Sequence, residues 1–242
     1  MARRRFFVDA VRSGAAELRG DDARHLTRVL RVEPGQQYEI SDTRSAYLAE
    51  IVEARGERVL FRVLEPIASP EPSASITLAA ALFKFDRFEW IIEKATELGA
   101  ARILPVAAAR SEKGLFEASH KRAARWARIA HEAGQQSRRL RPPEILATRR
   151  FDAALSLASE FRYFLDEASV PPLLDTLPDS RPHGAPIALL VGPEGGWTDA
   201  ERQAAAAALW TPASLGPQIL RAETAALAGL AILSSAWLAT AR

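Results

Sequence analysis

A glycine-rich loop between an apolar run and a helix start is the segment of this 242-residue chain best suited to ligand binding. It reads Val191-Gly192-Pro193-Glu194-Gly195-Gly196-Trp197-Thr198. Three glycines within five residues let a ligand approach the backbone closely, and a helix start offers unpaired N–H donors. The spacing matches neither a dinucleotide fingerprint nor a phosphate-binding loop, so the ligand is not held by a triphosphate. A tight strand-to-helix turn without a ligand explains the glycines equally well.

A second loop, Ser214–Thr224, carries Gly216-Pro217 and leads into the last apolar stretch. Arg221, Glu223 and Thr224 are the polar residues where this stretch begins. Two such loops at the ends of neighbouring parallel strands form one crevice at the carboxyl edge of a sheet, where α/β proteins bind ligands. The alternative is that the polar residues only cap a helix.

Basic residues gather in the middle of the chain. Residues 71–150 carry 15 basic and 9 acidic side chains, whereas residues 151–242 carry 5 and 10. Arg122, Arg125 and Arg128 recur at a spacing of three, which indicates a basic helix face for nucleic acid or simply a solvated face. The N-terminal run Arg3–Phe7 offers arginines and aromatics for base stacking, and is equally compatible with an edge strand.

Several classes of protein are excluded by composition. The chain has no cysteine, which excludes disulfides and thiolate metal sites, and its four histidines lack metal-ligand spacing. The apolar run after the N-terminal arginines stops at Asp9, so we expect no secretory signal. The apolar segment 225–241 is short and alanine-rich, which favours a buried helix over a membrane anchor. We therefore expect a cytoplasmic protein without a bound metal.

The pattern of elements indicates two domains. Residues 1–70 are β-rich, with strand-like runs at 38–40, 46–52 and 59–64, a helical piece at 25–31, and a proline-rich linker over 66–75. From residue 73 to 242, apolar runs at 76–82, 103–106, 163–165 and 187–191 alternate with helices expected over 86–98 and 119–134. Capping boxes are expected at Asp86/Glu89 and Thr198/Glu201. This alternation predicts an α/β domain with a mostly parallel sheet covered on both faces.

Taken together, these segments resemble the bacterial 16S ribosomal RNA (uracil-N3)-methyltransferases of the SPOUT, or trefoil-knotted, superfamily. The resemblance runs from end to end and is most specific in the two loops, Gly192–Gly196 and Leu215–Ala225. The other matching segments are Arg4–Phe7, His25–Arg31, Phe88–Gly99, and Glu132–Arg139 followed by Pro143–Ile145. Trp197 and Arg138 depart from the family pattern, since a smaller or aliphatic residue and a glycine are common at these positions.

The resemblance implies an N-terminal PUA-like β-barrel that binds RNA, over 1–70, and a C-terminal knotted α/β methyltransferase domain, over 73–242. It also implies S-adenosylmethionine as cofactor, pairing of two subunits through the knotted domain, and 16S ribosomal RNA in the small ribosomal subunit as substrate. The reaction implied is methyl transfer from the sulfonium to N3 of a uracil.

The resemblance also assigns residues to roles. Arg221, Glu223 and Glu194 are the catalytic candidates, with Arg221 as donor to a uracil oxygen or nearby phosphate and a glutamate as base or positioning group. The cofactor is expected to contact Val191, Gly192, Glu194, Gly195, Gly196, Leu215, Gly216, Ile219, Leu220 and Thr224. The RNA is expected to contact Arg4, Arg5, Arg28, Arg31, Lys84, Arg125, Gln136 and Arg139.

Two rival functions remain open from the sequence. One is a different RNA methyltransferase on the same scaffold, acting on a ribose 2′-hydroxyl or another base. The other is an RNA-binding or ribosome-assembly factor that keeps the fold without turnover. Cofactor binding separates the second rival from an enzyme, and identification of the methylated position separates the first.

Overall fold

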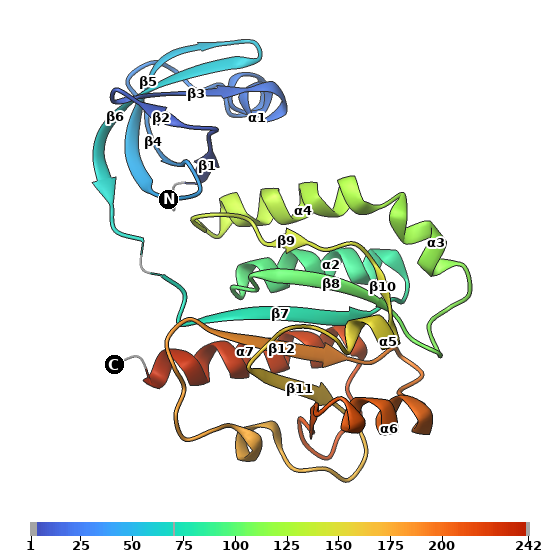
Figure 1. The fold of residues 1–242 in the computed structure, drawn as a ribbon. Helices are drawn as coiled ribbons and strands as arrows, with labels where there is room; N and C mark the ends of the chain where they lie inside the picture. The colour runs from blue at the N-terminus through green and yellow to red at the C-terminus, as the bar shows by residue number, and fades with distance from the viewer. Residues whose placement is uncertain (1–3, 70, 241–242) are drawn as a thin grey trace. The chain divides into compact units, whose positions relative to one another are not determined.

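The computed structural model describes residues 4–69 and 71–240, and its contacts divide the chain into two units, drawn in Figure 1. The first unit runs to Pro70 and also contains Glu132–Pro142. The second unit contains Glu71–His131 and Pro143–Arg242. The segment 132–142, which the sequence places within the second domain, therefore makes its contacts with the first.

The first unit is built on a six-stranded sheet in the order β1-β4-β5-β6-β3-β2. Its strands are β1 (Arg5–Phe7), β2 (Val11–Arg12), β3 (Ala15–Arg19), β4 (Gln37–Ser41), β5 (Ala46–Arg55) and β6 (Arg58–Ile67). The strands pair antiparallel except β1, which runs parallel to β4. The three predicted strands are thus confirmed, and the predicted linker is shortened because β6 extends to Ile67.

The N-terminal run of arginines and aromatics forms the edge strand of this sheet. Phe6 is fully buried and Phe7 nearly so, because both side chains pack within the unit. The edge-strand interpretation is therefore confirmed, and these rings are not available to stack on bases. Arg3 lies outside the described residues.

A short helical region follows β3 in the first unit. It consists of α1 (Gly20–Arg24) and the π-helix η1 (His25–Leu30), which ends at Arg31 with a φ of 50°. The helical piece expected over 25–31 is present, with π rather than α geometry. Leu26 anchors it in the core, whereas Val29 and Leu30 are exposed.

The second unit is built on a parallel sheet of seven strands. The order is β10-β8-β7-β12-β11-β13, with β9 also paired to β8, and every pairing is parallel. The strands are β7 (Ala74–Ala81), β8 (Arg102–Ala107), β9 (Glu144–Ile145), β10 (Arg149–Arg150), β11 (Phe161–Leu165), β12 (Ala185–Val191) and β13 (Thr211–Ala213). The predicted mostly parallel sheet is confirmed.

Helices cover both faces of this sheet, because side chains of each strand alternate between them. On β7, Leu78 packs in one core cluster and Ala79 in the other. The first face packs against α2 (Phe85–Glu97), α4 (Ala123–Gln136) and α7 (Ala222–Thr240), and the second against α5 (Phe151–Ala154) and α6 (Asp199–Ala207). Two short helices, α3 (Leu115–His120) and the 3₁₀ turn η2 (Leu173–Thr176), complete the unit.

Two local predictions in this unit are wrong. The capping box expected at Asp86 is absent, because α2 begins at Phe85 with Lys84 as an N-cap that makes no side-chain bond. Glu89 instead accepts hydrogen bonds from Arg125 at 2.7 and 2.8 Å. The single helix expected over 119–134 is broken into α3 and α4, since the chain turns at 121–122. The capping box at Thr198/Glu201 is confirmed.

The apolar C-terminal stretch forms α7, a helix long and apolar enough to cross a membrane. Its inner face lies in the core through Ala226, Leu230, Leu233 and Trp237. Gly229 lies where a Cβ would come within 3.0 Å of Leu189 and 3.1 Å of Leu165, so its absence lets α7 pack closely on β11 and β12. The expected helix is present and its inner face is buried in this unit, but only 39% of its apolar window is buried as a whole.

Candidate active site

A pocket of about 520 Å³ opens at the carboxyl ends of three parallel strands of the second unit. The end of β11 contributes 165–167, the loop after β12 contributes 191–197, and the loop after β13 contributes most of 215–222. Arg87 from α2 and Ala225 from α7 complete the lining. A crevice at this edge of a parallel sheet is where α/β folds bind ligands.

The two predicted loops do meet in one pocket, but the strands before them are not neighbours. β11 lies between β12 and β13, and this corrects the expected arrangement. The end of β11 therefore supplies the middle of the wall, with Leu165, Asp166 and Glu167.

The glycine-rich loop, Gly192–Trp197, is packed tightly against neighbouring side chains. A Cβ at Gly192 would lie 3.0 Å from the Trp197 ring, which is fully buried and stacked on Phe164 at 4.7 Å between centroids. Gly196 has a φ of +69°, and a Cβ there would collide with Glu167 Oε1. A side chain at Gly192 would thus crowd the buried Trp197 ring, and at Gly196 the positive φ favours glycine.

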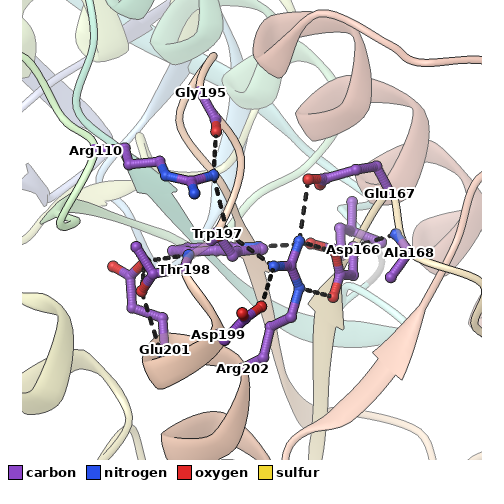
Figure 2. A network of polar contacts seen from close by, with 11 residues as sticks. Arg110, Asp166, Glu167, Ala168, Gly195, Trp197, Thr198, Asp199, Glu201 and Arg202 are labelled. Carbon is purple, nitrogen blue, oxygen red and sulfur yellow. Dashed lines mark hydrogen bonds and ion pairs between the residues drawn. The ribbon is translucent and has the colours of Figure 1, made fainter.

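A network of hydrogen bonds and ion pairs surrounds this loop, as Figure 2 shows. Arg110 Nη1 donates to the carbonyl oxygens of Gly195 at 2.8 Å and Trp197 at 3.2 Å. Arg202 Nη1 donates to the same Trp197 carbonyl at 2.8 Å. The Trp197 indole Nε1 donates to Leu165 O at 2.8 Å. The loop is thus bonded to β11, to α6 and to the segment after β8.

The strongest pair in this network joins α6 to the end of β11. Arg202 binds Asp166 with two parallel hydrogen bonds, Nε to Oδ2 at 2.8 Å and Nη2 to Oδ1 at 3.0 Å. Burial alone would raise the pKa of Asp166, but the hydrogen bonds from Arg202 and from the Ala168 N–H, together with the charge of Arg202, hold this pKa below its ordinary value. The same bonds raise the pKa of Arg202. Asp166 is therefore an ionised structural partner at neutral pH.

The pocket has a charged end formed by residues from three elements. Arg87 on α2 pairs with Glu194 of the glycine-rich loop, and its Nη1 lies 3.9 Å from Glu223 Oε1 at the start of α7. The Glu223 side chain is 11% exposed, and its buried Oε2 has no hydrogen-bond partner among residues 4–69 and 71–240. A buried acceptor left free is a feature that functional sites retain in spite of its cost.

The structure brings together most of the residues predicted to form the site. Arg221 and Glu194 line the pocket, whereas Glu223 is not among the lining residues and lies 3.9 Å from Arg87, which is. Thr224 is exposed and does not line the pocket. The remaining predicted cofactor contacts all line it: Val191, Gly192, Gly195, Gly196, Leu215, Gly216, Ile219 and Leu220.

The predicted RNA contacts of the first unit fall into two groups. Arg4, Arg28, Arg31 and Gln136 are exposed, and Arg139 is half-buried. Burial, with repulsion from Arg141, lowers the pKa of Arg139 to about 10, so its guanidinium stays charged at neutral pH.

Arg5 differs from these residues because it is only 4% exposed. Its guanidinium binds Glu39 at 3.0 Å and Ser69 at 3.0 Å, and Glu39 is also bound by Arg138. This buried ion pair holds Arg5 inside the first unit instead of presenting it to RNA. Arg138 has a φ of +57°, a conformation that glycine adopts more easily.

The predicted RNA contacts of the second unit, Lys84 and Arg125, are both exposed. Lys84 lies at the start of α2. Arg125 on α4 is 51% exposed and forms the paired hydrogen bonds to Glu89 described above. Its guanidinium is therefore partly neutralised in the free protein.

Several site residues were missed from the sequence. Arg87, Asp166, Glu167 and Gln218 line the pocket, and Arg110 and Arg202 brace its loop. Asp166 and Glu167 directly follow a predicted strand, which is a usable signal for a site at a sheet edge. Arg87, Arg110 and Arg202 have no such signal, because isolated arginines on helices and loops are usually solvent-exposed.

Comparison with known proteins identifies the class of this fold and site. Residues 69–234 match the model of the RNA methyltransferase domain, and residues 18–64 match the RNA methyltransferase PUA domain. The protein is thus an RNA methyltransferase with a PUA domain ahead of its catalytic domain, as predicted.

Comparison with individual relatives identifies the family within this class. The chain is 31% identical to ribosomal RNA small subunit methyltransferase E of Bacillus subtilis, over 95% of both chains. It superimposes on the same-named protein of Neisseria gonorrhoeae, solved bound to S-adenosyl methionine, with a TM-score of 0.86, 32% identity and 98% of both chains covered. A Legionella pneumophila protein described as a methyltransferase with bound SAM has a TM-score of 0.87, 28% identity and the same coverage. The chain belongs to the ribosomal RNA small subunit methyltransferase E family.

Proposed function

We propose that this protein transfers a methyl group from S-adenosylmethionine to N3 of a specific uridine in the 16S ribosomal RNA of the small ribosomal subunit. The observation that carries the proposal is the pocket between the glycine-rich loop and the loop after β13, with one charged end. The relatives named ribosomal RNA small subunit methyltransferase E indicate the RNA, and the Neisseria structure indicates the cofactor.

The lining fits S-adenosylmethionine. The volume of the pocket, about 520 Å³, is in the usual range for small-molecule sites. Leu215, Ile219 and Leu220 provide apolar walls for an adenine, while the glycine-rich loop lets the backbone approach the ribose and methionine parts. The carboxylate of Glu167, which is 45% exposed at the end of β11, suits a ligand that carries positive charge. The residues that line the pocket do not form a phosphate cradle.

The chain's own residues supply what N3 methylation needs. The bound cofactor provides a methyl group on a sulfonium. Uracil N3–H is weakly acidic, so the site must remove its proton and stabilise the negative charge that develops on the ring. Arg221, exposed at the pocket and directly before α7, donates to a uracil oxygen. A single such donor typically contributes about 10²–10³-fold in rate.

The proton acceptor is one of the two glutamates held by Arg87. Glu194 lines the pocket and is 45% exposed, whereas Glu223 is buried and one of its oxygens has no partner in the described part of the chain. Arg87 holds both carboxylates near one point, so that either receives the proton without leaving the site. Comparison of Glu194→Gln with Glu223→Gln decides between them, because loss of the base removes the acid limb of the pH–rate profile.

RNA binding is assigned to exposed and half-buried basic residues of both units. Arg4, Arg28, Arg31 and Arg139 belong to the first unit, together with Gln136, and Lys84 and Arg125 to the second. Phosphate contacts by these cations predict strong salt dependence, and each lost contact lowers the slope of log affinity against log salt by about 1.

We also propose that two subunits pair through the second domain. The 18-residue apolar window of α7 has a mean hydropathy of 1.4, yet only 39% of it is buried within the chain. Leu238 on this helix is 57% exposed, and Leu98 beside Ser234 is 36% exposed. A homodimer covers this surface, and light scattering then gives about twice the chain mass of 26.4 kDa. Family resemblance further supports a closed PUA-like barrel over 1–70, a trefoil knot within 73–242, and a cytoplasmic location.

The experiment that tests the proposed function is methyl transfer from labelled S-adenosylmethionine to small ribosomal subunits that lack their own modification. The product nucleoside is identified after digestion. Label in N3-methyluridine is expected. Label in another nucleoside, such as a ribose-methylated one, would keep the cofactor but overturn the substrate atom, and failure to bind the cofactor would overturn the enzyme assignment.

A further inference from the structure

We propose that Arg202 and Arg110 form an arginine clamp that positions the glycine-rich loop for the cofactor. The clamp rests on the proposed function, since it concerns the same pocket. Neither arginine lines the pocket, so both act through the loop and are positioning residues rather than catalytic ones.

Arg202 joins the two wall segments of the pocket that come from different strands. Its Nε and Nη2 bind both oxygens of Asp166, and Nη2 also lies 3.1 Å from Glu167 Oε1, at the end of β11. Its Nη1 binds the Trp197 carbonyl, after β12, at 2.8 Å and Asp199 at 3.3 Å. One guanidinium thus fixes the loop, the end of β11 and the start of α6 together, as Figure 2 shows.

The geometry of this contact requires arginine. A planar guanidinium donates in several fixed directions at once, whereas a lysine ammonium is a single point charge on a flexible stem. The Asp166 side chain is 4% exposed, so a lysine at 202 would keep the buried charge compensated while losing the fork. Arg202→Lys therefore separates the positioning of the loop from neutralisation of Asp166.

Arg110 holds the same loop from a separate segment. It follows β8, is exposed, and donates to the Gly195 and Trp197 carbonyls. The segment around it is tied to α6, because the Ala109 N–H donates to Glu201 Oε1 at 2.8 Å. Since Arg110 has no buried charge partner among the described residues, its replacement tests the clamp with little risk to folding.

The clamp determines which backbone groups the loop presents to the pocket. The carbonyls of Gly195 and Trp197 are bonded to arginines outside the lining, which directs them away from the ligand. Arg202 also holds Glu167, whose carboxylate lies over Gly196. A loop fixed in this way is shaped before the cofactor arrives, so that binding does not have to order it.

The test is calorimetric titration of the wild type, Arg202→Lys and Arg110→Lys with S-adenosylmethionine, with each melting temperature recorded. Methyl transfer is then measured against cofactor concentration. Arg162→Lys on β11 is the matched control, since Arg162 makes none of these contacts, and Gln203→Ala is an exposed control on α6. Displacement of positioning groups by about 1 Å reduces efficiency by up to about 100-fold.

We expect Arg202→Lys to raise the cofactor Kd and KM about tenfold or more, with kcat at saturating cofactor within about twofold. Arg110→Lys raises them by a smaller factor, and the controls leave them unchanged. Unaltered cofactor affinity in folded Arg202→Lys and Arg110→Lys would overturn the clamp, even if the melting temperature falls. If Arg202→Lys does not fold, Arg110→Lys alone decides. Absence of wild-type binding would overturn the proposed function and the clamp with it.

Discussion

The two loops that form the pocket differ in how they are held, although both follow strands of one parallel sheet. The glycine-rich loop is bonded to two arginines and packed over a buried tryptophan. In the part of the chain that the structure describes, residues 215–220 of the second loop make no hydrogen bond or ion pair, and Ile219 is 88% exposed. One wall of the pocket is preformed, and we expect the other to close over the ligand.

The difference between the two loops suits two tasks of a methyltransferase, which are to hold the cofactor in a fixed position and to admit the cofactor and the RNA. A preformed wall gives the cofactor a fixed position at low entropic cost. We expect the loosely held wall to admit the cofactor from one side and then to contact both cofactor and RNA, since Ile219 and Leu220 precede the proposed catalytic Arg221. Loops that close over substrate commonly complete a catalytic site in this way.

The largest effect is expected at the end of the loose loop. Arg221→Ala removes the donor to the uracil oxygen and lowers kcat about 10²–10³-fold. Calorimetry finds the cofactor Kd within a few-fold of the wild type, because the preformed wall is intact. Turnover near the wild-type rate would show that chemistry does not depend on this loop.

The next effect is expected within the fixed loop. Gly196→Ala introduces a Cβ against Glu167 at a positive φ, and we expect cofactor affinity to fall about tenfold or more. The matched control is Gly195→Ala, whose Cβ would meet Arg110 at an ordinary 3.4 Å without positive φ. Equal affinities of the two variants in a titration would contradict the tight fit at Gly196.

Trp197→Phe tests how much the indole hydrogen bond of the glycine-rich loop contributes to the stability of the folded protein. The ring still fills the space beside Phe164, but the buried Leu165 carbonyl loses its indole donor. An unsatisfied buried acceptor costs about 1–3 kcal/mol in free energy of unfolding. Urea denaturation measures this loss, and an unchanged midpoint would mean that water replaces the indole.

Ile219→Ala tests whether the loosely held second loop closes over the cofactor, and it leaves the packing of the fold unchanged. The side chain is exposed in the free protein, so thermal stability is expected to be unchanged. If the loop closes over the adenine, the lost apolar contact weakens cofactor binding about fivefold. Affinity equal to the wild type would indicate that the loop stays open.

The smallest effect is expected in the pH dependence of the free energy of unfolding, through Asp166, the partner of Arg202. The pKa of Asp166 is lowered in the folded protein, so its ionised form favours folding above its ordinary value of 3.8. This contribution is lost as pH falls below that value toward the folded-state pKa. The stability difference between wild type and Asp166→Asn, from denaturation at stepped pH, should therefore shrink only at this acid end.

Much of the architecture could be predicted from the sequence, because apolar runs and glycines mark it locally. The parallel strands around Ile76 and Ile187, and the capping box at Thr198, are set by residues close together in the chain. The capping box at Asp86 failed because Glu89 has a tertiary partner, Arg125, which no local pattern shows.

The two loops of the candidate site could be predicted from the sequence, whereas the arginines that bind these loops from other elements could not. Gly192–Gly196 and Arg221 carry a family motif, and the structure places them in the lining of one pocket. Arg87 and Arg202 reach the site only through strand order and helix packing, which place residues distant in sequence side by side. The burial of Arg5 was likewise hidden, since its partners Glu39 and Ser69 lie 34 and 64 residues away.

Hydrogen exchange of the free and cofactor-bound protein tests most directly whether one wall is preformed and the other closes. We predict that the amides of Gly196 and Thr198, whose N–H groups donate to Pro193 O and Glu201 Oε2, are protected without cofactor. Those of 215–221 exchange rapidly and gain protection only when S-adenosylmethionine is added. Equal exchange of the two loops in the free protein, or no change at 215–221 on saturation, would contradict this account.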